Sequence, residues 1–450
     1  MQTTDVTHQL ARWIVDYPAA SLPEVVKREG LRTVVNWFGC AIGGSPHETV
    51  DRALNAVRLF TGPAQATVFG RGRELDALHA ALLNGITSHV LDYDDTHLKT
   101  IIHPAGPVAA AAFAVAEMMP VTGADLLTAI ILGIETECRI GNSVYPDHYD
   151  RGWHITGTAG VFGAAAAVGR LLGLDQQKMT WALGIAATQS SGLREMFGTM
   201  CKSFHPGRAA QNGTMAAFLA RAGFDSSERA IEAPRGFANV MSTKQDYSEI
   251  LDGLGERWET SLNTYKPYAC GIVIHPSIDG CEQIKAEIGD AVRSIAKVEL
   301  TTHPLVLELT GKRTPKTGLE GKFSVYHSAA TALLRGDGTP SAFTDEIVAD
   351  PEIIALRDRV TATADWSMPE ESVKIIVTLN DGTTIKKYVK HALGSVERPL
   401  SDAQLDDKFR KSSIPVLGQA VTDEVLATIW SLPTLPSINA LAALTIPART

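Results

Sequence analysis

The sequence predicts a mainly α-helical protein with an α+β insertion. Apolar residues recur at helical spacing through about the first 260 residues. Apolar and polar residues begin to alternate, as is typical of strands, only after Tyr265. The helical spacing of apolar residues returns after Pro399. Because 450 residues are too many for one compact core, we expect more than one domain. The predicted domains are a large helical one, built from 1–264 and 398–450, and a smaller α+β one at 265–397.

Several segments of the first part carry the helical pattern. Two of them, 105–118 and 157–172, are rich in alanine and glycine. Small residues let neighbouring helix backbones approach closely, so we expect these two to be central helices surrounded by others. The predicted helices of this part are 22–43, 75–91, 105–118, 124–142, 157–172, 175–190 and 208–222.

The α+β insertion is predicted to contain a β-hairpin. Its first strand alternates Val, Ile, Val and Leu with other residues on the opposite face, and Asn380-Asp-Gly382 then supplies a glycine-containing turn. The elements predicted after residue 265 are a strand at 297–309, a helix at 323–334, strands at 373–379 and 384–389, and helices at 402–408 and 423–430.

Composition narrows the class of protein. Hydrophobic residues make up 45% of the chain and charged residues 20%, which is ordinary for a globular protein. A net charge of −9 argues against a nucleic-acid partner and against an anionic membrane surface. The scattered cysteines form no C-x-x-C pair and indicate reduced thiols. With no secretory signal and no apolar run near the length of about 20 residues that a membrane helix needs, we expect a cytoplasmic protein.

The densest group of titratable side chains is Asp92, Asp94, Asp95, His97 and His103, between two apolar helical runs. Such groups are costly to desolvate at the edge of a core, which favours a functional site over the alternative of a solvated turn or cap. A Mg²⁺-diphosphate site would need a third carboxylate one helical turn further on, and none is there. The two histidines are poorly spaced for one helical face, and no H-E-x-x-H occurs, so no metal is predicted.

Histidine, lysine and arginine side chains form a second set of candidates in this acidic chain. His103 and His154 each lie ahead of a predicted helix, while Lys202 and Arg208 lie near the start of another and oppose its macrodipole. An anionic ligand would resolve that conflict. Lys266 stands at the domain junction, where clefts form. Taken alone, each histidine could simply cap a helix or lie in the core, and each lysine or arginine could simply be a surface cation. With no phosphate-binding loop and no G-x-S-x-G, the set favours a small polycarboxylate ligand.

Several motifs follow one another in a fixed order along the chain. They are Leu91-Asp-Tyr-Asp-Asp-Thr-His97 with His103-Pro104, Gly152-Trp-His154, Cys201 to Gly213, Lys266-Pro-Tyr-Ala-Cys270, Gly321-Lys-Phe-Ser324, and Pro399-Leu-Ser401 before Lys408-Phe409. In this order they resemble the MmgE/PrpD family, which includes 2-methylcitrate dehydratase, cis-aconitate decarboxylase and iminodisuccinate epimerase. The resemblance covers nearly the whole chain.

The resemblance implies a homodimeric enzyme that needs no metal or organic cofactor, with its active site between the helical domain and an α+β lid. The decarboxylase branch carries a tyrosine where this chain has His327, with Tyr326 one residue earlier. That branch also has a histidine near Lys266, whereas the first one here is His275. Both differences disfavour decarboxylation. The positions that match the active site of that branch are Asp92, Thr96, His103, His154, Lys202 and Lys266.

We therefore expect a cofactor-independent lyase that abstracts a proton next to a carboxylate of a small di- or tricarboxylate, most like a 2-methylcitrate dehydratase. The alternatives are an epimerase of an iminodisuccinate-like dicarboxylate and a cis-aconitate decarboxylase. His103 is the predicted general acid or base, because an imidazole titrates near neutrality. The predicted catalytic residues are His103, Asp92, Lys202, His154 and His327, and the predicted substrate-binding residues are Thr96, Lys266, Arg208 and Tyr326.

Overall fold

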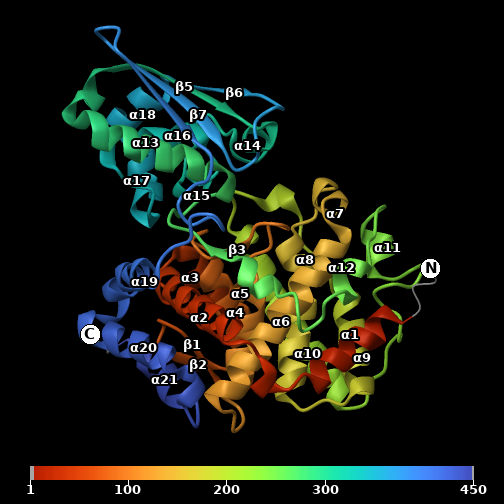
Figure 1. The fold of residues 1–450 in the computed structure, drawn as a ribbon. Helices are drawn as coiled ribbons and strands as arrows, with labels where there is room; N and C mark the ends of the chain where they lie inside the picture. Colours follow the sequence, from red (N-terminus) through yellow and green to blue (C-terminus); the bar gives the residue numbers. More distant parts are fainter. Residues whose placement is uncertain (1–4, 448–450) are drawn as a thin grey trace.

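The computed structural model of the chain describes residues 5–447. Helices dominate this part of the chain, and its strands form two two-stranded ladders and one four-stranded sheet. In Figure 1 the four-stranded sheet and its helices stand apart, at the top, from a larger helical body. The predicted fold class, mainly α with an α+β part, is confirmed.

The helical body is formed by the first part of the chain and is completed by its C-terminal helices. Its first helices are α1 (Val6–Asp16), α2 (Glu24–Gly44), α3 (Glu48–Val57), α4 (Ala77–His89), α5 (Ala105–Ala116) and α6 (Gly123–Val144). They are followed by α7 (Asp147–Asp150), α8 (Ile155–Leu171), α9 (Gln176–Ala187), α10 (Cys201–Arg221), α11 (Phe237–Met241) and α12 (Ser248–Leu251). The two short ladders pair β1 (Ala66–Val68) with β2 (Arg73–Leu75) and β3 (Asp95–His97) with β4 (Asn263–Tyr265).

Small residues bring the central helices α4, α5, α8 and α10 into close contact. Every residue of α5 is buried. A Cβ added to Gly85 of α4 would lie 2.5 Å from the Cα of Gly207 in α10, and one added to Gly213 would lie 2.5 Å from the Cβ of Ala164 in α8. Only glycine allows backbones to approach this closely. The prediction that the alanine- and glycine-rich segments are central helices is confirmed.

Helix α10 begins at Cys201, seven residues before the predicted start at residue 208. Pro206 lies two residues before the predicted start, but the structure has it inside the helix. It cannot donate to the preceding turn, yet it packs against α5, where a Cβ on Gly106 would lie 3.1 Å from that of Pro206. Packing in the core thus overrides the local signal, and Lys202 lies in the first turn of the helix.

The α+β part follows β4 along the chain. Its sheet has the order β6-β5-β7-β8, in which β5 and β6 are parallel and the other pairs are antiparallel. Its helices are α13 (His275–Ile288), α14 (Pro304–Thr310), α15 (Gly318–Gly321), α16 (Val325–Arg335), α17 (Asp345–Val348) and α18 (Pro351–Arg357). Its strands are β5 (Ile295–Thr302), β6 (Val360–Ala364), β7 (Val373–Leu379) and β8 (Thr384–Val389).

Two predictions for this part have different outcomes. The hairpin is confirmed, with β7 and β8 paired across a turn in which Gly382 has a left-handed φ of 87°. The strand predicted at 297–309 is wrong in its second half, because β5 ends at Thr302 and α14 begins at Pro304. The His303 side chain caps this helix by accepting a hydrogen bond from the Leu305 N–H at 3.2 Å. The apolar residues of this stretch therefore divide between a strand and a helix.

The C-terminal helices return to the helical body. They are α19 (Asp402–Leu417), α20 (Gln419–Trp430) and α21 (Asn439–Leu444), and Figure 1 shows α19 and α20 in blue beside the red α2 and α3. Phe409 of α19 packs so closely on α2 that a Cβ on Gly39 would lie 3.2 Å from its Cα. Residues from both chain ends share one apolar core, and the α+β part has another. These cores fit the predicted division at residues 265 and 397, which stays a prediction.

Two further expectations concern membrane spans and cysteines. Between residues 5 and 447, no helix combines the length and apolar character that crossing a bilayer requires. All five cysteines are unpaired, as the sequence predicts, and only Cys201 is exposed.

Candidate active site

The loop between α4 and α5 carries the acidic segment, and a short ladder joins it to a distant part of the chain. Within this ladder, β3 pairs antiparallel with β4, and Thr96 lies opposite Thr264. The Thr264 hydroxyl donates to the Thr96 carbonyl at 2.6 Å. Because β4 ends at Tyr265, the ladder brings the next residue, Lys266, beside the start of the acidic loop.

Asp92 is the centre of the site. Its Oδ1 lies 2.6 Å from the Nζ of Lys266 and 2.9 Å from the Nζ of Lys202. All three side chains are buried. The backbone of Asp92 has a φ of 51°, a left-handed conformation that is costly for a residue other than glycine and is often found at functional sites.

One carboxylate therefore faces two ammonium groups. Burial alone would raise the pKa of Asp92, but Lys202 and Lys266 outweigh it and hold this pKa well below its usual range. Burial lowers the pKa of Lys202 despite the nearby carboxylate, whereas for Lys266 the carboxylate outweighs burial and raises the pKa. With both lysines charged, the group has an excess positive charge that an anionic ligand would neutralise.

His103 lies beside this group as a neutral imidazole. Its Nδ1 lies 2.7 Å from the Asp95 carbonyl and 3.2 Å from the Thr96 hydroxyl. A carbonyl oxygen can only accept, so Nδ1 carries the proton and Nε2 keeps a lone pair. Burial lowers the pKa of His103 to about 3 despite the nearby Asp94 carboxylate. The free Nε2 is therefore unprotonated at neutral pH and can accept a proton, but the expectation that this imidazole titrates near neutrality is wrong for the closed site.

Two further imidazoles lie close to His103. His89 contacts the Asp94 carboxylate through Nδ1 at 2.6 Å, and the Nδ1 atoms of His154 and His205 are 2.8 Å apart. Among the described residues, the buried Nε2 atoms of His89 and His154 have no hydrogen-bond partner. Ring nitrogens of His89, His103 and His154 lie within 4.8 Å of one another. Because each ring is oriented by a second partner, the trio could hold a Zn²⁺-like ion or face a bound substrate.

Two small cavities flank the ion pair of Lys202 and Asp92, and both also touch Phe323. One has a volume of about 30 Å³ and is lined by His103, His154 and Lys266 among others; the other has a volume of about 20 Å³ and is lined by His89 and Lys322 among others. Each is the size of about one water molecule. Their walls come from both the helical body and the α+β part. Neither cavity therefore has room for a polycarboxylate in this structure.

The structure brings most of the predicted site residues together, but not all. Arg208 is exposed on the outer face of α10 and donates to Gln211 Oε1 at 2.6 Å. His327 contacts the Ala342 carbonyl at 2.9 Å inside the α+β part, and Tyr326 lies under the guanidinium of Arg313. None of the three lines either cavity. The predicted residues that do gather are Asp92, Thr96, His103, His154, Lys202 and Lys266.

These differences have physical reasons. Because α10 starts at Cys201, Arg208 lies about two turns into the helix, on the same exposed face as Cys201. His327 is in the first turn of α16, and its N–H donates to the hydroxyl of the N-cap residue Ser324. Its side chain is buried in the interior of the α+β part.

Sequence reasoning missed two residues that line the smaller cavity. His89 ends α4, one helical turn before Asp92, and this spacing from the acidic segment could have identified it. Lys322 follows α15 in the motif Gly321-Lys-Phe-Ser324, but nothing in the motif alone separates it from a surface lysine.

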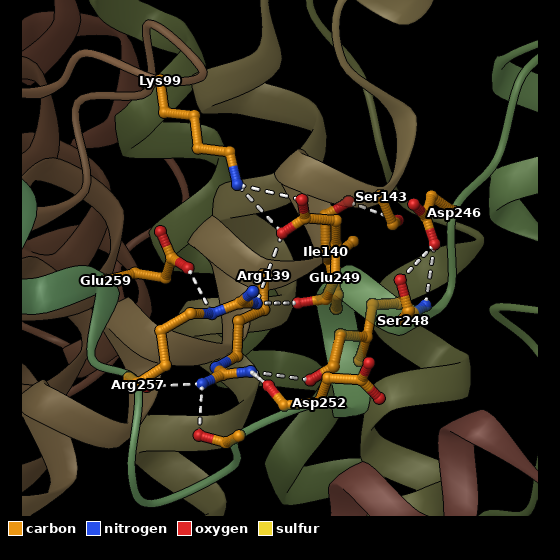
Figure 2. Close-up of polar contacts among 12 residues, drawn as sticks. Lys99, Arg139, Ile140, Ser143, Asp246, Ser248, Glu249, Asp252, Arg257 and Glu259 are labelled. Atoms are coloured by element: carbon orange, nitrogen blue, oxygen red, sulfur yellow. Dashed lines mark hydrogen bonds and ion pairs between the residues drawn. The ribbon is translucent and has the colours of Figure 1, made fainter.

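A network of ion pairs holds the acidic loop from the outside, and Figure 2 shows most of it. Lys99 Nζ lies 2.9 Å from Glu249 Oε2, which lies 3.3 Å from Arg257 Nη2. The same arginine pairs through Nε with Glu259 Oε1 at 3.2 Å, and Glu259 Oε2 lies 3.0 Å from Nε2 of His97. His97 therefore anchors the loop and does not face the cavities.

Family models and known relatives match most of the chain. The family model for the MmgE/PrpD N-terminal domain matches residues 8–250, and that for the MmgE/PrpD C-terminal domain matches residues 268–432. Cis-aconitate decarboxylase from Aspergillus terreus is 26% identical over 98% of this chain and 95% of its own. Its human counterpart is 25% identical over 99% and 95%. The 2-methylcitrate dehydratase of Cupriavidus necator is 25% identical over 84% of each chain.

The site makes a prediction about stability. Asp92→Asn should lower the free energy of unfolding at pH 7 by about 3–5 kcal/mol, because it leaves two buried ammonium groups without a counter-charge. The carboxylate has a lowered pKa, so its contribution is fully present at this pH and would be lost only in acid. Urea unfolding followed by circular dichroism measures the change.

Glu48→Gln is the matched control, since it removes a carboxylate from an exposed ion pair with Arg52. It should change stability little. Equal stability of Asp92→Asn and the wild-type protein would contradict the role of Asp92 as the shared counter-charge.

Proposed function

Because the chain belongs to the MmgE/PrpD family, we propose that it is a lyase that removes water from a small hydroxylated di- or tricarboxylate, as a 2-methylcitrate dehydratase does. The observation that carries this proposal is the group of Asp92, Lys202 and Lys266 beside the free Nε2 of His103. It combines excess positive charge with a base. Relatives that align along most of the chain include a 2-methylcitrate dehydratase, whose name states this reaction, and cis-aconitate decarboxylases, which act on a tricarboxylate without a hydroxyl group.

In the proposed reaction, Lys202 and Lys266 bind substrate carboxylates. His103 Nε2 removes a proton from the carbon next to one of them. The carbanion that forms spreads its charge into that carboxylate, where the two ammonium groups stabilise it. The electron pair of the broken C–H bond forms a C=C bond as the C–O bond of the neighbouring carbon breaks. The Thr96 hydroxyl and the Asp95 carbonyl hold the imidazole in the required tautomer.

The remaining wall of the larger cavity favours a substrate that also has an apolar group. Its apolar part is formed by Tyr149, Phe197, Ile272, Leu309 and Phe323. An alkyl branch such as the methyl group of 2-methylcitrate would lose contact with water against these side chains. The proposal requires no organic cofactor and no metal.

Decarboxylation is the second candidate, because the decarboxylase relatives align over more of this chain than the dehydratases do. The same lysines would hold cis-aconitate. However, His327 occupies the place of that branch's tyrosine and faces away from the cavities. The epimerase alternative would use the same proton abstraction. It would convert one stereoisomer of the substrate into the other and form no other product.

The proposal predicts the effect of removing the base and one lysine. In D₂O with 2-methylcitrate, citrate, cis-aconitate or iminodisuccinate, proton NMR should show water elimination from 2-methylcitrate. His103→Ala and Lys202→Ala should each lower its rate on the order of 10²–10⁴-fold.

The control variants are His391→Ala and Lys411→Ala, whose side chains pair with carboxylates away from the cavities. They should keep the wild-type rate. Full activity in His103→Ala and Lys202→Ala would refute the proposed site. Release of CO₂ from cis-aconitate without dehydration would support the second candidate, and proton exchange with epimerisation alone would support the third.

The imidazole trio allows a metal-dependent reaction to be tested separately. We expect activity to survive dialysis against EDTA, because the proposed chemistry uses lysines where a metal ion would otherwise stabilise the carbanion. Activity and metal content are measured on the same sample. Loss of activity with EDTA that Zn²⁺ or Mg²⁺ restores would show a metal-dependent lyase instead.

We also propose that the protein is a homodimer joined through α10. The exposed face of this helix carries residues at alternating spacings of three and four, the pattern of a helix that packs along a second helix. Exposed apolar side chains on this central helix would be covered by a second copy. The exposed residues of this face are Cys201, Phe204, Arg208 and Met215, and the half-buried Gln211 and Phe218 continue the same spacing.

Met215→Glu should therefore convert the dimer to a monomer, because it places a charge in the middle of this face. Light scattering after size-exclusion chromatography measures the mass. Met118→Glu is the matched control, since both methionines are 38% exposed. A dimer that withstands Met215→Glu would place the interface elsewhere, and a monomeric wild-type protein would refute the dimer.

A further inference from the structure

Dehydration needs a second proton-transfer group besides His103. The leaving hydroxyl departs easily only if an acid protonates it. The residues that the sequence suggested for this step, His327 and Tyr326, do not line the cavities. A group for this role must be buried beside the ion pair of Lys202 and Asp92, and it must lie on a different side of that pair from His103.

Lys322 meets both conditions. It follows α15, and its side chain crosses from the α+β part to the helical body, where Nζ donates to the Val90 carbonyl at 3.2 Å. The residue is 4% exposed. Unlike Lys202 and Lys266, it forms no ion pair with a carboxylate among the residues that the structure describes. An ammonium group can donate three hydrogen bonds, so this one keeps donors for a ligand.

The two cavities place Lys322 and His103 on different sides of the same ion pair. His103 lines the larger cavity and Lys322 the smaller one, while Lys202, Asp92 and Phe323 touch both. A substrate bound to Lys202 between the separated parts would therefore meet the two groups from different directions. This is the arrangement that a base on one side and an acid on the other require.

The environment suits Lys322 to proton transfer. Burial lowers its pKa to about 7, with a further lowering by Lys202 and Lys266 and an opposing effect of Asp92. An amine that titrates near neutrality can give up a proton readily. Lys408 is also buried, but it donates to Asn36 and to the Tyr93 carbonyl and lines neither cavity.

We propose that Lys322 is the acid that protonates the leaving hydroxyl. This inference rests on the proposed dehydration. His103 Nε2 takes the proton from carbon, the C–H electron pair becomes the second bond of C=C, and the C–O bond breaks with its electrons on oxygen. The Lys322 ammonium gives its proton to that oxygen, and water leaves. The neutral amine and the imidazolium then regain their starting states by proton exchange with solvent.

The test separates the two proton transfers. Lys322→Met should lower kcat for dehydration on the order of 10²–10⁴-fold. Exchange of the substrate C–H with D₂O, which needs His103 and the two lysines at Asp92 but not Lys322, should stay within a few-fold of wild type. Proton NMR in D₂O measures both rates in one sample. Lys312→Met is the matched control, an exposed lysine paired with Glu320 of α15, and it should keep both rates.

A pH profile gives a second readout. In the wild-type protein kcat/KM should fall as pH rises through about 7, because the ammonium form is lost. Lys322→Arg stays protonated throughout, so the residual activity should lack this alkaline decline. The charged and titratable groups that face Lys322 are Asp92, Lys202, Lys266, Cys270, His47 and His89, and all of them remain in the variant.

The outcomes are distinguishable from failure of the proposed function. If the wild-type protein neither dehydrates nor exchanges any of the acids, the function itself is refuted. If the wild-type protein dehydrates and Lys322→Met matches it, or raises KM with kcat unchanged, Lys322 is not the acid. Should Lys322→Met fail to fold, Lys322→Gln keeps a donor for the Val90 carbonyl and is subject to the same criteria.

Discussion

The carboxylate of Asp92, shared by two lysine ammonium groups, is the interaction on which the rest of the site depends. The three members of this group, Asp92, Lys202 and Lys266, come from the loop after α4, the first turn of α10 and the residue after β4. Buried ammonium groups are costly without a counter-charge, so this carboxylate stabilises both lysines in the interior. The ladder of β3 and β4 and the close crossing of α4 and α10 bring the segments to that point.

The same interaction explains why the site suits an anion and why it is closed. One negative and two positive charges leave an excess that a carboxylate ligand can neutralise, and burial strengthens the attraction. The walls include residues of the α+β part, and the space left is about 30 Å³ in the larger cavity. In the proposed function, a polycarboxylate would have to widen this space, and a site that closed over it would exclude water from the reacting atoms.

Much of the fold and of the site could be predicted from sequence because the signals were local. Helical spacing identified the central helices, and the crowded carboxylates and imidazoles identified the loop with Asp92 and His103. The sequence predictions failed where tertiary packing, and not the local sequence, determines the structure. Pro206 lies before the predicted helix start, but the core holds it inside α10, which leaves Arg208 on the outer face. Lys322 carries no local signal, since only the meeting of the two parts buries it beside the lysines.

The central claim is that the lysines meeting at Asp92 bind an acid with several carboxylates. Tricarballylate has three carboxylates and no hydroxyl to eliminate, so its binding can be measured by titration calorimetry without turnover. The account predicts that the wild-type protein binds it and that Lys266→Met weakens binding at least about tenfold, equivalent to roughly 1.4 kcal/mol. Equal affinity in the two proteins, or no binding by the wild-type protein, would contradict the account.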